Sequence, residues 1–104
     1  MRKTGGKRPS RSRSRSWHEE APLLSSERYR DLRVCGASCF GEPRSRPPKY
    51  PVCVKNSRSC RPVKEGCAAA RSRAAGLLGK TSSPQRISKL KALLRRLDRL
   101  CAGL

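Results

Sequence analysis

The clearest hydrophobic pattern in the chain lies close to its C-terminus. Apolar side chains recur there at alternating spacings of three and four, at Ile87, Leu90, Leu94, Leu97, Cys101 and Leu104, and Leu93 and Leu100 widen the stripe. This spacing is typical of an amphipathic helix. Ser83 is suited to the N-cap, with Pro84 at the first helical position, so the pattern predicts a helix from 84 to 102.

Two weaker helical segments precede this one. The alanine-rich stretch 67–78 favours a helix that Gly79 would end, and it offers the terminal helix a partner in a small helical hairpin. Residues 25–34 favour a short helix, with Ser25 or Ser26 as N-cap and Glu27 in the positively polarised first turn.

Residues 35–66 show no helical periodicity. Prolines and glycines interrupt the stretch at Gly36, Gly41, Pro43, Pro47, Pro48, Pro51, Pro62 and Gly66. Such spacing excludes long helices and predicts an irregular, cysteine-bearing loop region.

Composition makes a large core improbable. The chain has 104 residues, 35% of them hydrophobic, and 26 lysines and arginines stand against seven acids. Ordering costs roughly 1 to 2 kcal/mol of backbone entropy per residue, and excess like charge opposes compaction. We therefore predict a mostly disordered chain with a small α-helical C-terminal segment, divided into a basic arm (1–20), an irregular Pro/Cys-rich region (21–66) and a helical segment (67–104).

The charge of +19 predicts an anionic partner. Arginine outnumbers lysine, which favours nucleic acid, RNA more than DNA, because guanidinium groups bind phosphates and stack on bases. An anionic membrane surface is a further candidate, through the basic face of the terminal helix.

Arginine and serine alternate over residues 10–16, and this repeat resembles the RS tracts of splicing-related proteins. The positive charge of the arm predicts contacts with the phosphates of RNA or DNA at Arg8, Arg11, Arg13 and Arg15, and the resemblance implies that phosphorylation regulates them. Phosphorylation of the serines, at Ser10, Ser12, Ser14 and Ser16, would add roughly −6 to −8 charges and release the nucleic acid.

The six cysteines are interpreted through the predicted compartment. Residues 2–16 contain no apolar side chain, so no secretory signal is expected and the thiols are predicted to be reduced. The alternatives are a disulfide framework, were the chain secreted, or a zinc site from Cys35, Cys39, Cys53 and Cys60. His18 is the single histidine, and we expect no metal or other cofactor.

Motifs for catalysis are missing from the sequence. It has no phosphate-binding glycine loop, paired-carboxylate site or nucleophile elbow, so we predict a non-enzyme without a small-molecule substrate. The expected location is the nucleus or nucleolus, with mitochondrion or cytoplasm as alternatives.

The leucine face of the terminal helix has competing interpretations. Leu90, Leu93, Leu94 and Leu97 would contact a partner protein, and residues 90–94 resemble the LxxLL box that docks on nuclear-receptor domains. The same face would serve packing against 67–78 in a hairpin, and the two uses exclude each other.

These observations predict a small nuclear adaptor that holds RNA or DNA electrostatically through its arm and recruits a protein through its helix. The alternative is an interaction protein or viral-type accessory factor that acts through the helix, with the arm serving only for nuclear or nucleolar import. A third hypothesis is a newly arisen reading frame with no selection for a fold.

Overall fold

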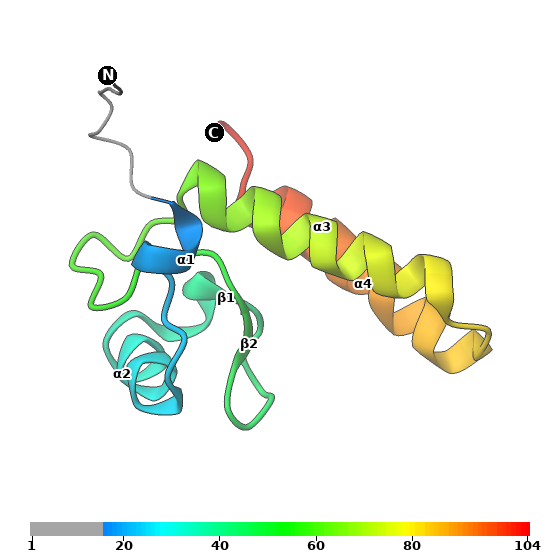
Figure 1. Ribbon diagram of the computed structural model, residues 1–104, viewed down its shortest axis with the longest axis horizontal. Helices are drawn as coiled ribbons and strands as arrows, with labels where there is room; N and C mark the ends of the chain where they lie inside the picture. Colours follow the sequence, from blue (N-terminus) through cyan, green and yellow to red (C-terminus); the bar gives the residue numbers. More distant parts are fainter. Residues whose placement is uncertain (1–15) are drawn as a thin grey trace, which may run out of the picture.

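The computed structural model describes residues 16–104, and this part of the chain is folded (Figure 1). Its elements are α1 (Trp17–Glu20), α2 (Ser25–Cys35), the 3-10 helix η1 (Gly36–Cys39), β1 (Phe40–Glu42), β2 (Lys49–Pro51), α3 (Lys64–Lys80) and α4 (Pro84–Leu100). The prediction of a mostly disordered chain is therefore wrong. The physical reason lies in three disulfides, which lower the entropy of the unfolded chain.

Helices α3 and α4 run side by side as an antiparallel hairpin (Figure 1). α4 begins as predicted, because Pro84 opens it and the side chain of Ser83 accepts a hydrogen bond from the backbone N–H of Arg86 at 3.4 Å. α3 begins three residues before the predicted start and continues through Gly79 to Lys80. The cap residue Thr81 has extended backbone, so the end of α3 needs no left-handed glycine.

The hairpin core is formed by leucines of α4 and alanines of α3. Leu90, Leu93 and Leu97 are buried, and they belong to one apolar cluster with Ala70 and Ala74. Small side chains on one helix let the other approach closely, which explains how the weakly hydrophobic α3 becomes part of a core.

The N-terminal half gathers around one end of the hairpin (Figure 1). β1 and β2 form an antiparallel pair with Phe40 opposite Pro51 and Glu42 opposite Lys49. α2 begins at Ser25, so Leu24 occupies the cap position in place of the predicted serine. Glu27 lies in the first turn, as predicted, and its carboxylate accepts the Leu24 N–H at 3.1 Å.

Three disulfides join segments that the sequence separates. They link Cys35 to Cys60, Cys39 to Cys53 and Cys67 to Cys101, with Cα–Cα distances of 5.2, 5.1 and 6.1 Å. The prediction of reduced thiols is wrong, and the zinc alternative fails because its four sulfurs are already bonded in pairs. Closing each loop contributes about 3 to 4 kcal/mol by the chain-entropy estimate.

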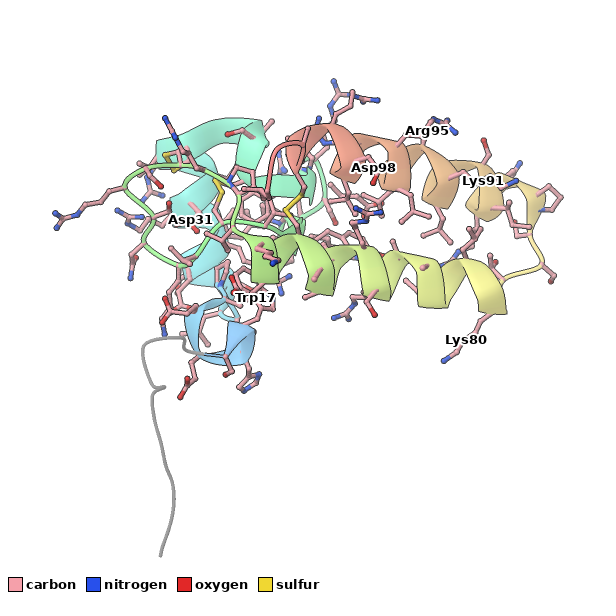
Figure 2. The ribbon with its side chains drawn as sticks, turned by 90° about the horizontal axis from the view of Figure 1, so that it is seen from above. Trp17, Asp31, Lys80, Lys91, Arg95 and Asp98 are labelled. Carbon is pink, nitrogen blue, oxygen red and sulfur yellow. A yellow bond between two sulfur atoms is a disulfide. The ribbon has the colours of Figure 1, made fainter. Side chains whose placement is uncertain are left out.

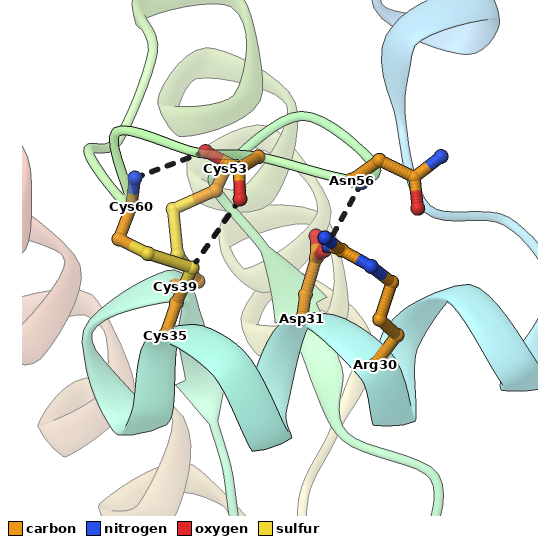
Figure 3. A network of polar contacts seen from close by, with 8 residues as sticks. Arg30, Asp31, Cys35, Cys39, Cys53, Asn56 and Cys60 are labelled. Atoms are coloured by element: carbon orange, nitrogen blue, oxygen red, sulfur yellow. Dashed lines mark hydrogen bonds and ion pairs between the residues drawn. A yellow bond between two sulfur atoms is a disulfide. The ribbon is translucent and has the colours of Figure 1, made fainter.

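A buried carboxylate connects α2 to the loop that follows β2 (Figure 3). Asp31 is fully buried, and its Oδ1 accepts the Asn56 N–H at 3.1 Å and lies 3.3 Å from Nη1 of Arg30. Burial raises the pKa of Asp31 above its usual value, although these two contacts oppose the rise. In the same loop the Ser57 hydroxyl accepts the Cys60 N–H at 3.1 Å, and the Sγ of Cys35 touches the Ser57 carbonyl oxygen at 3.7 Å.

Two glycines allow the halves to meet. A Cβ placed on Gly41 would lie 2.7 Å from Leu93 Cδ1 and 3.1 Å from Leu97 Cδ2, so β1 rests directly on α4. A Cβ on Gly66 would lie 2.7 Å both from the Trp17 ring and from the Val52 carbonyl oxygen. These close approaches fix α1 and the sheet against the hairpin.

Candidate anion-binding sites

The predicted nucleic-acid and phosphorylation sites belong to the N-terminal arm. Arg8, Arg11, Arg13 and Arg15, together with Ser10, Ser12 and Ser14, lie outside the described residues. Ser16 is described, and it caps α1: its N–H donates to Oε1 of Glu19 at 3.2 Å, and its carbonyl oxygen accepts the Glu19 N–H at 3.0 Å. Contact with RNA and phosphorylation of the arm stay predictions.

The predicted partner-contact leucines lie on the inner side of α4. Leu90, Leu93 and Leu97 have 7%, 4% and 0% of their surface exposed, and Leu94 is half-buried. The hairpin interpretation of this face is confirmed. A protein partner could reach these leucines only if α4 separated from α3, so that contact stays a prediction.

The outer face of α4 carries a row of basic side chains, at Lys91, Arg95 and Arg99, which we term the α4 stripe. These residues follow one another at intervals of four and all are exposed. Figure 2 shows Lys91 and Arg95 on the side of α4 turned away from α3. At 1.5 Å of rise per residue, the stripe places three positive charges along about 12 Å of a rigid helix.

The single acid of α4 does not neutralise the stripe. Asp98 forms an exposed ion pair across the hairpin with Nη2 of Arg71 at 3.1 Å. Arg96 also differs from the stripe, because its guanidinium donates to the carbonyl oxygens of Ala37 at 2.8 Å and Phe40 at 3.2 Å. Arg96 therefore holds η1 and β1 and is not part of the exposed stripe.

A cavity of about 580 Å³ opens between α1, the start of α2, β2 and α3, and we term it the α1–α3 pocket. Aromatic rings and positive charges line it together, from Trp17, His18, Arg28, Lys49, Tyr50 and Arg73. None of its lining residues is acidic. Sequence periodicity could not reveal this site, because its residues come from four distant segments.

Hydrogen bonds and burial fix two of these side chains. The Arg28 guanidinium donates from Nε to the Pro22 carbonyl oxygen at 2.8 Å and from Nη1 to that of Pro48 at 3.2 Å. Burial, followed by repulsion from Arg73, lowers the pKa of Arg28. Burial first, and the charge of Glu42 second, raise the pKa of Tyr50. Because Arg28, Lys49 and Arg73 line the pocket and no acid does, the pocket would favour an anion.

A smaller cavity of about 340 Å³ lies beside the disulfide between Cys67 and Cys101, with Lys64 and Arg71 at its rim. Within residues 16–104, no three or more histidine, cysteine or acidic side chains are grouped so that they could hold a metal ion. No helix in this same range combines the length and the apolar character needed to cross a bilayer.

Comparison with known proteins gives no relative from which a function could be transferred. No model of a protein family, no curated protein and no solved structure matches the chain. Its function must therefore be argued from its own residues.

Proposed function

We propose that this protein binds a sulfated polysaccharide through the α4 stripe and works in an oxidising compartment, as a binding protein and not as an enzyme. The observation that carries the proposal is the stripe itself: Lys91, Arg95 and Arg99 point to solvent from one face of a helix, with no acid among them. Repeating anions along a polymer suit evenly spaced cations on a rigid support.

The hairpin makes the stripe suitable for this task. The inner face of α4 is packed on α3, and the disulfide from Cys67 to Cys101 ties the C-terminal end of α4 to the first turn of α3. The three charges therefore keep their spacing before a ligand arrives, which lowers the entropy lost on binding. Guanidinium groups also form paired, charge-assisted hydrogen bonds with the oxygens of tetrahedral anions.

The disulfides support the choice of polymer. Three disulfides account for all six cysteines, and disulfides persist in oxidising surroundings such as the cell exterior. Polyanions that a protein meets there include heparin-like chains, for which basic clusters are a known recognition device. The nuclear adaptor stays a prediction, but the three disulfides and the packed leucine face favour the extracellular binding protein over it.

The test is a comparison of two triple variants of the full chain. K91Q/R95Q/R99Q removes the stripe, whereas R33Q/R58Q/R61Q removes three exposed positive charges elsewhere and is the matched control. Affinity for heparin is measured from low to physiological salt, with circular dichroism to verify that both variants fold. We expect the stripe variant to bind at least about tenfold more weakly than the control at physiological salt. Equal losses in the two variants would contradict a defined site.

The same titrations with single-stranded RNA and duplex DNA show which class of polyanion the protein binds most tightly. Tighter binding to either nucleic acid than to heparin at physiological salt would overturn the polysaccharide assignment. A further full-length variant, R11Q/R13Q/R15Q, tests the arm. If this variant loses more heparin affinity than the stripe variant, the binding site is the arm and the proposal fails.

A further inference from the structure

The α1–α3 pocket is separate from the α4 stripe, because no residue of α4 lines it. Its volume of about 580 Å³ falls within the range of cavities that hold small organic ligands. Its lining combines aromatic rings with cationic side chains, and each kind of group limits what the pocket can bind.

No acidic side chain stands in the lining of the pocket beside its positive charges, although Glu42 lies opposite Lys49 in the strand pair. Within residues 16–104, Lys49 and Arg73 form no ion pair and no hydrogen bond through their side chains. Arg28 is anchored by two carbonyl oxygens, which leaves other guanidinium N–H groups for a ligand. Arg73 and Arg28 repel each other, so an anion between them would relieve that repulsion.

The aromatic walls are positioned by the fold. The ring of Trp17 rests against Gly66, where a Cβ would come within 2.7 Å of it. Tyr50 is 9% exposed, and its φ of 58° lies in the left-handed region that a tyrosine seldom adopts. Strain of this kind is often retained at binding sites, where it aims a side chain.

We propose that the α1–α3 pocket binds an aromatic ring that carries an ester-linked oxyanion, an aryl sulfate or aryl phosphate, as found on a modified tyrosine side chain. The ring packs between Trp17 and Tyr50, since aromatic pairs attract in offset or edge-to-face geometry. The oxyanion lies between Arg28 and Arg73, with Lys49 at the edge. This activity is independent of polysaccharide binding by α4.

Trp17 is the only tryptophan of the chain, so its fluorescence reports on the pocket directly. The full-length protein is titrated with phenyl sulfate, phenyl phosphate, phenol and inorganic sulfate. We expect a saturable change of Trp17 emission with one or both aryl esters, and affinities at least about tenfold lower for phenol and for inorganic sulfate. The aryl ester that binds more tightly shows whether the natural ligand carries a sulfate or a phosphate.

Two single variants and the stripe variant complete the test. R73Q is expected to weaken binding of the preferred aryl ester about tenfold, because it removes a pocket-lining cation whose side chain forms no ion pair or hydrogen bond within residues 16–104. R61Q removes an exposed charge outside the pocket and should bind as the wild type does. The proposal is overturned if R73Q retains full affinity while its circular dichroism is unchanged, or if phenol binds as tightly as the esters. Unchanged ester binding by K91Q/R95Q/R99Q would separate this site from the α4 stripe.

Discussion

The helical hairpin and the N-terminal half achieve order in different ways. In residues 64–104, three buried leucines of α4 meet alanines of α3 over two helices of 17 residues each, and one disulfide closes the open end. In residues 16–63, the elements are short, and two disulfides each join cysteines that are 25 or 14 residues apart in sequence. The Arg28 side chain also donates to the backbone carbonyl oxygens of Pro22 and Pro48. The regular apolar face of α4 specifies the hairpin, whereas disulfides and single polar contacts specify the N-terminal half.

The largest expected effect comes from removing the disulfide between Cys39 and Cys53, whose sulfur atoms lie in the core of the N-terminal half. In C39A/C53A we expect the free energy of unfolding to fall by about 3 kcal/mol or more. Amide hydrogen exchange should accelerate across residues 16–63 while the amides around Leu90 and Leu93 stay protected. C67A/C101A should show the reverse, with loss confined to the hairpin's open end. If amide hydrogen exchange accelerated uniformly along the chain in both variants, the two regions would not be stabilised separately and the comparison would be wrong.

The same contrast explains which features the sequence could predict. The 3–4 spacing of leucines and the Ser83-Pro84 cap identified α4 to within two residues of its end, because that helix is specified by its own periodicity. The pairing of Cys35 with Cys60 has no local signal, since 25 residues separate them. The prediction of disorder came from composition and charge, and the expectation of reduced thiols left the stabilising cross-links out of that argument.

The candidate sites follow the same rule. The basic residues of the α4 stripe are visible in the sequence, but only the structure separates them from Arg96, which holds β1. The α1–α3 pocket depends on tertiary contacts between Trp17, Tyr50 and Arg73, and no spacing in the sequence brings these together.

The next largest effect concerns the junction between the two regions. Leu97 is fully buried and lies against Gly41 of β1. We expect Leu97→Ala to lower the free energy of urea unfolding by about 2 to 5 kcal/mol, because it leaves a cavity. Leu104→Ala is the control: this leucine is 60% exposed, so a change within about 0.5 kcal/mol is expected. Similar small changes in both variants would mean that the halves do not share a core.

Two glycines of α3 offer a sharper comparison, since the same substitution should act in opposite directions. Gly76→Ala meets open space and should stabilise the exposed helix by about 0.5 to 1 kcal/mol. Gly66→Ala should destabilise by about 1 to 3 kcal/mol, because its Cβ would press on Trp17 and on backbone. Thermal unfolding of the two variants measures the difference. Stabilisation by both substitutions would show that α1 is not packed on α3.

The smallest effect is the pH dependence from Asp31 in the N-terminal half. Burial raises its pKa, so the folded state favours the protonated carboxyl. The protonated Asp31 carboxyl contributes its full stability when the pH is below the pKa of Asp31 in the unfolded chain, about 4. This contribution is lost as the pH rises through the higher pKa of Asp31 in the folded protein. The melting temperature of Asp31→Asn minus that of the wild type should therefore increase as the pH rises from about 4 to 6. A constant difference over this range would show that Asp31 does not titrate abnormally.

The central claim is that three specific disulfides define this fold, and peptide mapping without reduction tests it most directly. Cleavage after lysine and arginine should release one species that joins residues 65–71 to 100–104, and a second that joins 34–44, 50–55 and 59–64. Fragmentation between Cys35 and Cys39 should then assign Cys35 to Cys60 and Cys39 to Cys53. Free thiols in the folded protein, or Cys67 linked to any cysteine other than Cys101, would contradict the account.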